Sequence, residues 1–377
     1  MLKQLLKQIV IWRIALLAVM LIAINQISFK PSFPYAEQLL EPTGHPAFWG
    51  LANFDGVHYI GIADKGYFAQ FTQAFFPLFP MIMKWVNLLF NNYILSGYFI
   101  SHLSLLIFLY LFYQLIILDF SKKIAKNSLW FYLLFPTSFF FAAVYTESFF
   151  MMLTAGVFLA ARKKKWWLAG ILTAAASATR LFGILLIPAL LVELYQQQKS
   201  KKISSLIGEK WRELTAIMLG TSGLFSYMYY LQKNFSDAFY FLTAQPVFGA
   251  QRSADKLILL YQVFWRYTKM IFTVDPASIL YFTVSQEFLF SIAFLVLSII
   301  AFKKTRLSYA VFGVLAYIMP TLTGTFSSMP RYVLALFPAF ILLGQIQNKT
   351  IRYTLYAIST ALLAVNLSLF TRGYWVS

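Results

Sequence analysis

Long apolar runs separated by short basic segments constrain this chain more than any other feature. Residues 9–27, 95–118 and 351–370 are each long enough to cross a bilayer as a helix and hold few or no charges. The 377 residues are 60% hydrophobic and 12% charged, whereas a soluble domain carries about 25% charged residues. The excess of Phe, Leu and Ile must face lipid, so we predict an all-α polytopic membrane protein.

The formal net charge of +18 does not indicate nucleic-acid binding, because the Lys and Arg residues form no stripe or face. They cluster instead between the apolar runs, which is typical of cytoplasmic loops. Lys3 and Lys7 place the N-terminus in the cytoplasm, and residues 119–126, 162–165 and 199–202 follow as cytoplasmic loops. Alternation then gives about eleven spans and an outer C-terminus. The predicted spans are residues 9–27, 95–118, 127–143, 148–161, 166–180, 181–195, 214–231, 288–302, 307–326, 332–346 and 351–370.

Two large loops lie on the outer side in this topology, residues 28–94 and 232–285. Residues 71–90 of the first loop are apolar but contain Pro77 and Pro80, so we predict a helix in the outer interface rather than a span. The second loop contains "LILLYQVFWRYTKMIF", whose amphipathic pattern predicts a helix lying flat on the membrane.

Polar residues embedded in apolar sequence fall on one side of this topology. An ionised side chain at membrane depth costs about 2.5–3.5 kcal/mol or more, so several at one level predict a shared polar cavity. These residues are Asp55, His58 and Asp64 of the first loop, Glu147, Arg180 and Arg331 at tight outer turns, and Arg252 of the second loop.

Each of these residues has a structural alternative. Asp55 in "FDGVHY" is placed to cap a helix N-terminus, and Asp64 in "ADKGY" is typical of a turn. Glu147 fits a solvated turn residue, while Arg180 and Arg331 fit side chains that reach toward lipid headgroups.

Motifs for metals, nucleotides and thiol chemistry are missing from the sequence. There is no cysteine, no P-loop, no GxGxxG, no HExxH and no GxSxG pattern. No Asp-x-Asp pair offers a metal–diphosphate clamp, and His58 has no partner at metal-ligand spacing, so it fits a packed histidine better than a ligand. We therefore expect neither a metal nor another cofactor.

The stretch "FDGVHYIGIADKGY" at residues 54–67, followed by "AFFPLFP", resembles the first luminal loop of the PIG-V family, the GPI mannosyltransferase II family of the GT-C class. That family has a W-D-G…Y…A…G-Y run before an F-F-P-L-F-P run, and Phe54 stands at the tryptophan position. Three further stretches, "FPTSFFFAAVYTESFF", "SATRLFG" and "SSMPRYVLALFP", extend the resemblance over most of the chain.

The resemblance implies one GT-C membrane domain over residues 1–377, with its active site on the outer or luminal face under the first loop. It implies a polyprenyl-phosphate donor (dolichyl phosphate in eukaryotes) that carries a single sugar, typically mannose. By the same resemblance, Asp55 matches the catalytic aspartate of the first loop.

Elementary chemistry gives these residues roles. An ionised Asp55 accepts the proton of an acceptor hydroxyl as that oxygen attacks the anomeric carbon, and attack opposite the leaving group inverts configuration. The leaving phosphate needs its charge held, which suits the forked donors of arginine. The candidate substrate-binding residues are Arg180, Arg331 and Arg252 for phosphate, Glu147 for sugar hydroxyls or for orienting an arginine, and Tyr59, Tyr67, His58 and Asp64 around the sugar.

Other readings stay open. The acceptor is a glycolipid, a glycan or a protein, and the composition favours a prokaryotic plasma membrane over an endoplasmic reticulum membrane. The alternative function is a transporter or flippase of an anionic lipid or solute, and a scaffold subunit is a third. The collection of polar groups at one face, rather than in broken spans at the midplane, favours the enzyme.

Overall fold

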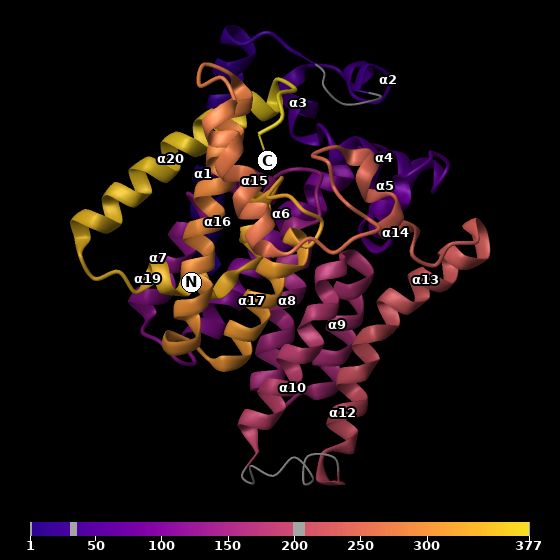
Figure 1. Ribbon diagram of the computed structural model, residues 1–377, viewed down its shortest axis with the longest axis vertical. Helices are drawn as coiled ribbons and strands as arrows, with labels where there is room; N and C mark the ends of the chain where they lie inside the picture. The colour runs from indigo at the N-terminus through magenta and orange to yellow at the C-terminus, as the bar shows by residue number, and fades with distance from the viewer. Residues whose placement is uncertain (1, 31–35, 199–207, 377) are drawn as a thin grey trace.

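The computed structural model describes residues 2–30, 36–198 and 208–376, and over these ranges the chain forms helices and turns without β-strands (Figure 1). This confirms the all-α prediction. Four of the described helices are long and apolar enough to cross a membrane, which is characteristic of an integral membrane protein. They are α1 (Leu2–Gln26), α6 (Tyr93–Ile116), α16 (Ile279–Lys304) and α20 (Lys349–Thr371).

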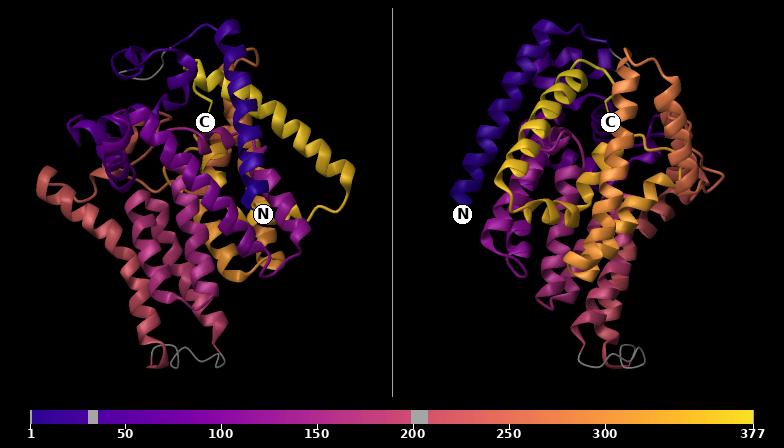
Figure 2. Two further views of the ribbon diagram at one scale, coloured as in Figure 1. Left: turned by 180° about the vertical axis from the view of Figure 1, so that it is seen from behind. Right: turned by 60° about the vertical axis from the view of Figure 1, so that its left-hand side comes forward.

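A second set of helices is shorter and lies at positions where the sequence predicted further spans. The predicted number of eleven spans stays a prediction, because these helices fall below the length of a full crossing. They are α8 (Glu147–Arg162), α9 (Trp166–Thr179), α10 (Leu186–Gln197), α12 (Trp211–Met218), α13 (Ser222–Phe235) and α17 (Leu307–Thr321). Of these, α8 packs against α6 and α17 packs against α16, while the others pack mainly against one another and against α8 and α17. The first and last helices of the chain, α1 and α20, lie side by side (Figure 2).

Small residues let α9 approach the α12–α13 segment closely. A Cβ atom added to Gly170 of α9 would lie 1.9 Å from the carbonyl oxygen of Ala216, and one added to Gly223 would lie 2.0 Å from that of Ala174. Close backbone approach at small residues is the usual way in which helices associate where lipid removes the hydrophobic driving force.

Two predicted spans are broken. Residues 127–143 were expected to form one helix, but α7 (Lys122–Leu133) ends before Pro136, and residues 134–146 follow an irregular buried path. Residues 332–346 are likewise divided, into a short helix α18 (Met329–Tyr332), a 3₁₀ turn and α19 (Phe337–Gly344). Proline removes a backbone donor and restricts the residue before it, so each segment changes direction near a proline.

The irregular backbone of residues 134–146 is tolerated because protein covers it and hydroxyl groups satisfy its carbonyls. The two half-helices beside it, α7 and α19, pack together through Tyr132 and Phe340, whose ring centroids are 3.8 Å apart. The hydroxyl contacts are Ser101 Oγ to Ala143 O at 2.7 Å, Ser148 Oγ to Phe141 O at 2.7 Å, and Ser138 Oγ to Leu133 O at 2.7 Å.

The elements of the two large loops gather at the upper end of the bundle, where the C-terminus also lies (Figure 1). The predicted interfacial helix within residues 71–90 is α5, whose Trp85, Leu88 and Leu89 are 71%, 79% and 80% exposed, as expected of a face turned toward lipid. The loop helices are α2 (Ala36–Leu39), α3 (Pro46–Trp49), α4 (Asp55–Lys65), α5 (Leu78–Phe90), α14 (Tyr240–Thr243) and α15 (Leu260–Thr273).

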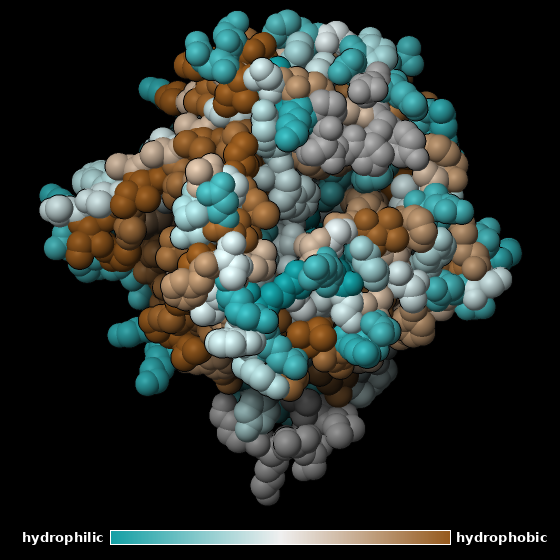
Figure 3. Space-filling model, turned by 45° about the horizontal axis from the view of Figure 1, so that its top comes forward, coloured by the Kyte–Doolittle hydropathy of each residue, from teal (hydrophilic) through white to brown (hydrophobic). Residues whose placement is uncertain are grey.

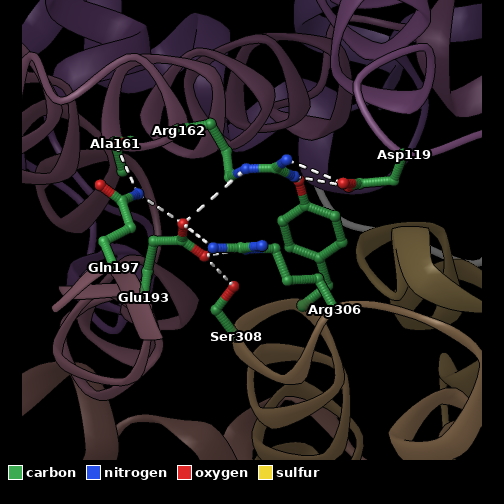
Figure 4. Close-up of polar contacts among 8 residues, drawn as sticks. Asp119, Ala161, Arg162, Glu193, Gln197, Arg306 and Ser308 are labelled. Atoms are coloured by element: carbon green, nitrogen blue, oxygen red, sulfur yellow. Dashed lines mark hydrogen bonds and ion pairs between the residues drawn. The ribbon is translucent and has the colours of Figure 1, made fainter. Parts of the chain in front are cut away.

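The opposite, lower end carries the loops that the sequence predicted to be cytoplasmic. The basic cluster at residues 199–202 lies outside the described residues. Around the other loops, four charged side chains form a dense ion-pair network, here called the lower cluster (Figure 4). Two of them belong to α8 and α10, one follows α6 and one precedes α17. The lower cluster consists of Asp119, Arg162, Glu193 and Arg306.

Candidate active site

Asp55 begins helix α4 after a strained residue. Phe54 has φ +56° and ψ −116°, which non-glycine residues rarely adopt and which is typical of functional sites. The Tyr145 hydroxyl holds this turn, because it accepts a hydrogen bond from Asp55 N at 3.1 Å and donates one to Asn53 O at 2.9 Å. The Asp55 carboxylate makes no helix-capping hydrogen bond and is turned instead toward an arginine.

That arginine is Arg331 of α18, whose Nη1 lies 2.6 Å from Asp55 Oδ2. The loop before Arg331 is held by Glu287, which accepts one hydrogen bond on each carboxylate oxygen. Ser328, at φ +65°, donates its N–H to Glu287 Oε1 at 3.1 Å, and the Tyr267 hydroxyl donates to Glu287 Oε2 at 2.6 Å. The side chain of Arg331 is 8% exposed, so contacts with other residues, and not solvent, fix the position of its guanidinium group.

Glu147 links Arg331 to a second arginine. It is the first residue of α8, where the helix dipole favours a carboxylate. Its Oε1 accepts a hydrogen bond from Arg180 Nη1 at 2.8 Å and lies 3.6 Å from Arg331 Nε. Its Oε2 is buried and has no hydrogen-bond partner among the described residues. Asp55, Arg331, Glu147 and Arg180, here called the upper cluster, thus form one chain of charges from four separate elements.

Aromatic rings support both guanidinium groups from the sides. Arg331 Cζ lies 5.3 Å from the ring centroid of Phe140 and 5.4 Å from that of Tyr332. Arg180 Cζ lies 5.4 Å from the ring of Phe182 and 5.9 Å from the same Tyr332. Cation–π contacts stabilise an arginine without neutralising it, so the positive charge stays available to a ligand.

The upper cluster opens into a cavity of about 950 Å³, which lies within the range of small-molecule sites. Its charged lining consists of four cations and three carboxylates, a surplus of one positive charge. Its other walls are largely apolar and include a group of aromatic side chains, among them Phe71, Phe75, Phe76, Phe241 and Phe248. In the tilted view the surface is hollowed near its centre, with hydrophilic side chains in the recess (Figure 3).

The structure brings most of the sequence-predicted site residues together. Besides the upper cluster, His58, Tyr59 and Arg252 line the cavity. Burial lowers the pKa of His58, an effect that Asp55 partly opposes, and burial followed by the charges of Asp55 and Glu147 raises the pKa of Tyr59. Both side chains are therefore neutral near pH 7 and offer hydrogen bonds rather than charge.

Two predicted residues lie outside the cavity lining. The Tyr67 hydroxyl donates to Phe75 O at 2.6 Å, and its ring packs on Tyr227, so the contacts of Tyr67 are structural. Asp64 is exposed near the far end of α4, where its charge acts on Tyr93. The turn geometry suggested by "ADKGY" agrees with the end of α4, because Gly66 takes φ +73° there.

Sequence reasoning missed several residues that shape the site. Tyr145 fixes the turn at Asp55, Glu287 fixes the loop of Arg331, and Tyr332 lies beside both arginines of the cluster. A signal was available for Glu287, an isolated carboxylate inside a long apolar run. For the two tyrosines the signal was weak, because the sequence contains 23 tyrosines and these two stood out only by lying in the stretches of the family resemblance, close to the candidates Glu147 and Arg331.

No group of three or more His, Cys, Asp or Glu side chains able to hold a metal ion occurs within residues 2–30, 36–198 and 208–376. The expectation that the site works without a metal stays a prediction.

Comparison with known proteins gives a family. The model of the Mannosyltransferase (PIG-V) family matches residues 2–237, which is more than half of the chain and includes three of the four residues of the upper cluster. No curated protein matches the chain.

Proposed function

Because the chain belongs to the PIG-V mannosyltransferase family and is thus a glycosyltransferase, we propose that it moves mannose, with inversion, from a polyprenyl-phosphate donor to an acceptor hydroxyl. The reaction takes place at the upper cavity, on the extracytoplasmic face. The acceptor is a glycolipid, a glycan or a protein. The observation that carries the proposal is the chain Asp55–Arg331–Glu147–Arg180 at the wall of a cavity lined in part by aromatic side chains.

Asp55 acts as the general base in this proposal. Its Oδ2 is held by Arg331, while Oδ1 has no hydrogen bond from another described residue, and the side chain is 21% exposed to the cavity. The acceptor O–H transfers its proton to Oδ1 while its oxygen forms the new bond to the anomeric carbon. The bond between that carbon and the phosphate oxygen breaks, and its electron pair leaves with the phosphate.

Charge balance supports a lipid phosphodiester as the donor. The surplus of one positive charge in the cavity lining matches the single negative charge of a phosphodiester, whereas a nucleotide sugar brings a diphosphate with two charges. The largely apolar walls suit an isoprenoid chain, which a nucleotide does not have. The charge that develops on the departing phosphate is stabilised by preorganised donors, so no general acid is required.

The test uses the purified protein in lipid vesicles with polyprenyl-phosphate mannose or a nucleotide-activated mannose, and a panel of lipid, glycan and peptide acceptors. We expect transfer from the lipid donor, and NMR of the product should show an α-linked mannose from a β-linked donor. Efficient transfer from the nucleotide sugar, or a β-linked product, would contradict the proposal. Movement of the intact lipid across the vesicle membrane without any transfer would instead support the flippase.

A further inference from the structure

The three cavity arginines are unequally paired with carboxylates. Arg331 pairs with Asp55 at 2.6 Å and approaches Glu147 at 3.6 Å. Arg180 pairs with Glu147 through Nη1 alone. Arg252 donates only a long bond of 3.4 Å to Phe248 O and pairs with no carboxylate among the described residues. All three arginines therefore keep donors free for an anion, among them the buried Nε of Arg331, which has no hydrogen-bond partner among the described residues.

Tyr332 lies between two of these arginines. Its ring is 5.4 Å from Arg331 Cζ and 5.9 Å from Arg180 Cζ, and it packs on Phe182 with centroids 5.6 Å apart. It also lines the cavity. Tyr332 is partly buried, and its hydroxyl forms no hydrogen bond to any other residue that the structure describes, although phenols in protein interiors usually find a partner. A free O–H among guanidinium groups is suited to donate to an anion.

The electrostatic surroundings agree with this geometry. Burial and, to a smaller extent, the charge of Asp55 raise the pKa of the Tyr332 phenol, but Arg252, Arg331 and Arg180 outweigh both effects and hold the pKa below its ordinary value. A phenol in a positive field is a stronger hydrogen-bond donor than an isolated one, and its hydrogen bond to a charged acceptor is stronger than one to a neutral acceptor.

We propose that the Tyr332 hydroxyl, together with Arg180 and Arg252, binds the phosphate of the lipid donor and stabilises it as it leaves. This rests on the proposed function. Tyr332 keeps its proton throughout, because the acceptor's proton goes to Asp55 and the phosphate leaves as an anion. In this proposal Asp55 accepts the proton, and the phosphate is bound by Tyr332, Arg180 and Arg252. Arg331 connects the two parts, because it pairs with Asp55 and lies beside the ring of Tyr332.

The test measures inhibition by polyprenyl phosphate, the reaction product, in wild type and in Tyr332→Phe. The substitution removes one oxygen and keeps the ring on Phe182 and on both arginines. A hydrogen bond to a charged group contributes enough that its loss should weaken inhibition about tenfold or more. We also expect kcat to fall by at least a similar factor, while the acceptor KM stays within about twofold of wild type.

Three controls separate phosphate binding from folding. Tyr356→Phe removes a hydroxyl that donates to Asn127 O at 3.2 Å in another part of the molecule, and should leave inhibition unchanged. Polyprenol, which has no phosphate, should inhibit wild type and Tyr332→Phe equally. Tyr332→His, which keeps an N–H donor, should recover part of the phosphate affinity. Inhibition constants do not depend on the folded fraction, so a loss of folded protein cannot imitate the expected result.

Two results would overturn the inference, and they are distinguishable. Unchanged inhibition by polyprenyl phosphate in an active Tyr332→Phe enzyme would remove Tyr332 from the phosphate site and leave the proposed function standing. A wild-type protein that transfers no sugar from the lipid donor to any acceptor would overturn both.

Discussion

The two ion-pair clusters of this molecule are built from the same kinds of residue at opposite ends of the bundle, but they differ in how completely their charges are paired. In the lower cluster, Arg162 binds Asp119 through two hydrogen bonds of 2.5 and 2.8 Å, and Arg306 binds Glu193 through two of 2.6 and 2.8 Å (Figure 4). Ser308 and Gln197 donate two more to Glu193, at 2.6 Å each. Two cations balance two carboxylates, and Glu193 is fully buried.

The upper cluster uses its charges less completely. Its ion pairs run through single atoms, one oxygen of Glu147 has no partner among the described residues, and a third arginine stands nearby without a carboxylate. It borders a cavity that carries a surplus of one positive charge. A closed and balanced network ties loops together, whereas an open one with unused donors retains the capacity to bind a ligand. Pairing, and not the number of charged residues, distinguishes the two ends.

The largest expected effect contrasts one carboxylate from each cluster. Asp55→Asn keeps the shape of the side chain but removes the base, so transfer per folded molecule should fall by about 10²–10⁴-fold. The melting temperature should fall less than when a carboxylate is truncated, because the amide oxygen still accepts a hydrogen bond from Arg331 and Glu147 remains 3.6 Å from Arg331 Nε. Asp119→Asn is the matched change in the lower cluster, and its transfer rate per folded molecule should stay near wild type. Activity assays and thermal melts in detergent measure both. Full activity in Asp55→Asn would show that the upper cluster, like the lower one, contributes no base to the reaction.

The next effect should appear in stability. Glu193→Ala removes the fully buried carboxylate and leaves Arg306, whose side chain is 23% exposed, without its ion-pair partner, which costs up to about 3–5 kcal/mol. We expect a clearly lower melting temperature and poor yield, with nearly normal kcat in the folded fraction. Glu193→Gln, which keeps the hydrogen bonds to Ser308 and Gln197 possible, should lose less. A melting temperature unchanged in Glu193→Ala would show that the lower cluster does not stabilise the bundle.

A smaller effect tests the geometry of the arginines. Arg180→Lys keeps the positive charge but loses the forked donors, so one charged hydrogen bond to Glu147 or to the phosphate is lost. We expect the donor KM to rise about tenfold with an unchanged acceptor KM. Arg162→Lys is the lower-cluster counterpart and should change the melting temperature but neither KM. Equal effects of the two substitutions on the donor KM would show that the upper cluster binds the donor no more directly than the lower cluster does.

The smallest effect concerns pH. Burial lowers the pKa of His58, so the folded protein binds a proton at this site less readily than the unfolded chain. The stabilisation is complete above the unfolded pKa of about 6.5 and is lost as pH falls toward the folded value. Between pH 7.5 and 5.5 the wild type should therefore lose slightly more stability than His58→Phe, by at most about 1.4 kcal/mol for a single titrating group. Parallel melting curves for the two proteins would contradict this placement of His58.

The sequence predicted the helical class and the positions of most helices, because apolar length and basic clusters act locally along the chain. It also predicted that Asp55, Glu147, Arg180 and Arg331 share a site, since charge is rare in such sequence and the topology puts these residues at one end. The breaks in residues 127–143 and 332–346 were missed, although Pro136 and Pro338 stand in them. A hydropathy profile shows only that a segment is apolar, so it does not indicate where a proline ends a helix that the surrounding protein covers.

By itself, then, the sequence determined which residues must leave lipid and which end of the bundle they reach, because the cost of burying charge in a bilayer depends on residue type and span order. Only the tertiary structure decided the pairing: that Asp55 meets Arg331 across 276 positions, that Glu193 is saturated while Glu147 is not, and that Tyr332 stands between two guanidinium groups. Ion pairs and cation–π contacts form over a few ångströms, and the folding of distant segments sets those distances.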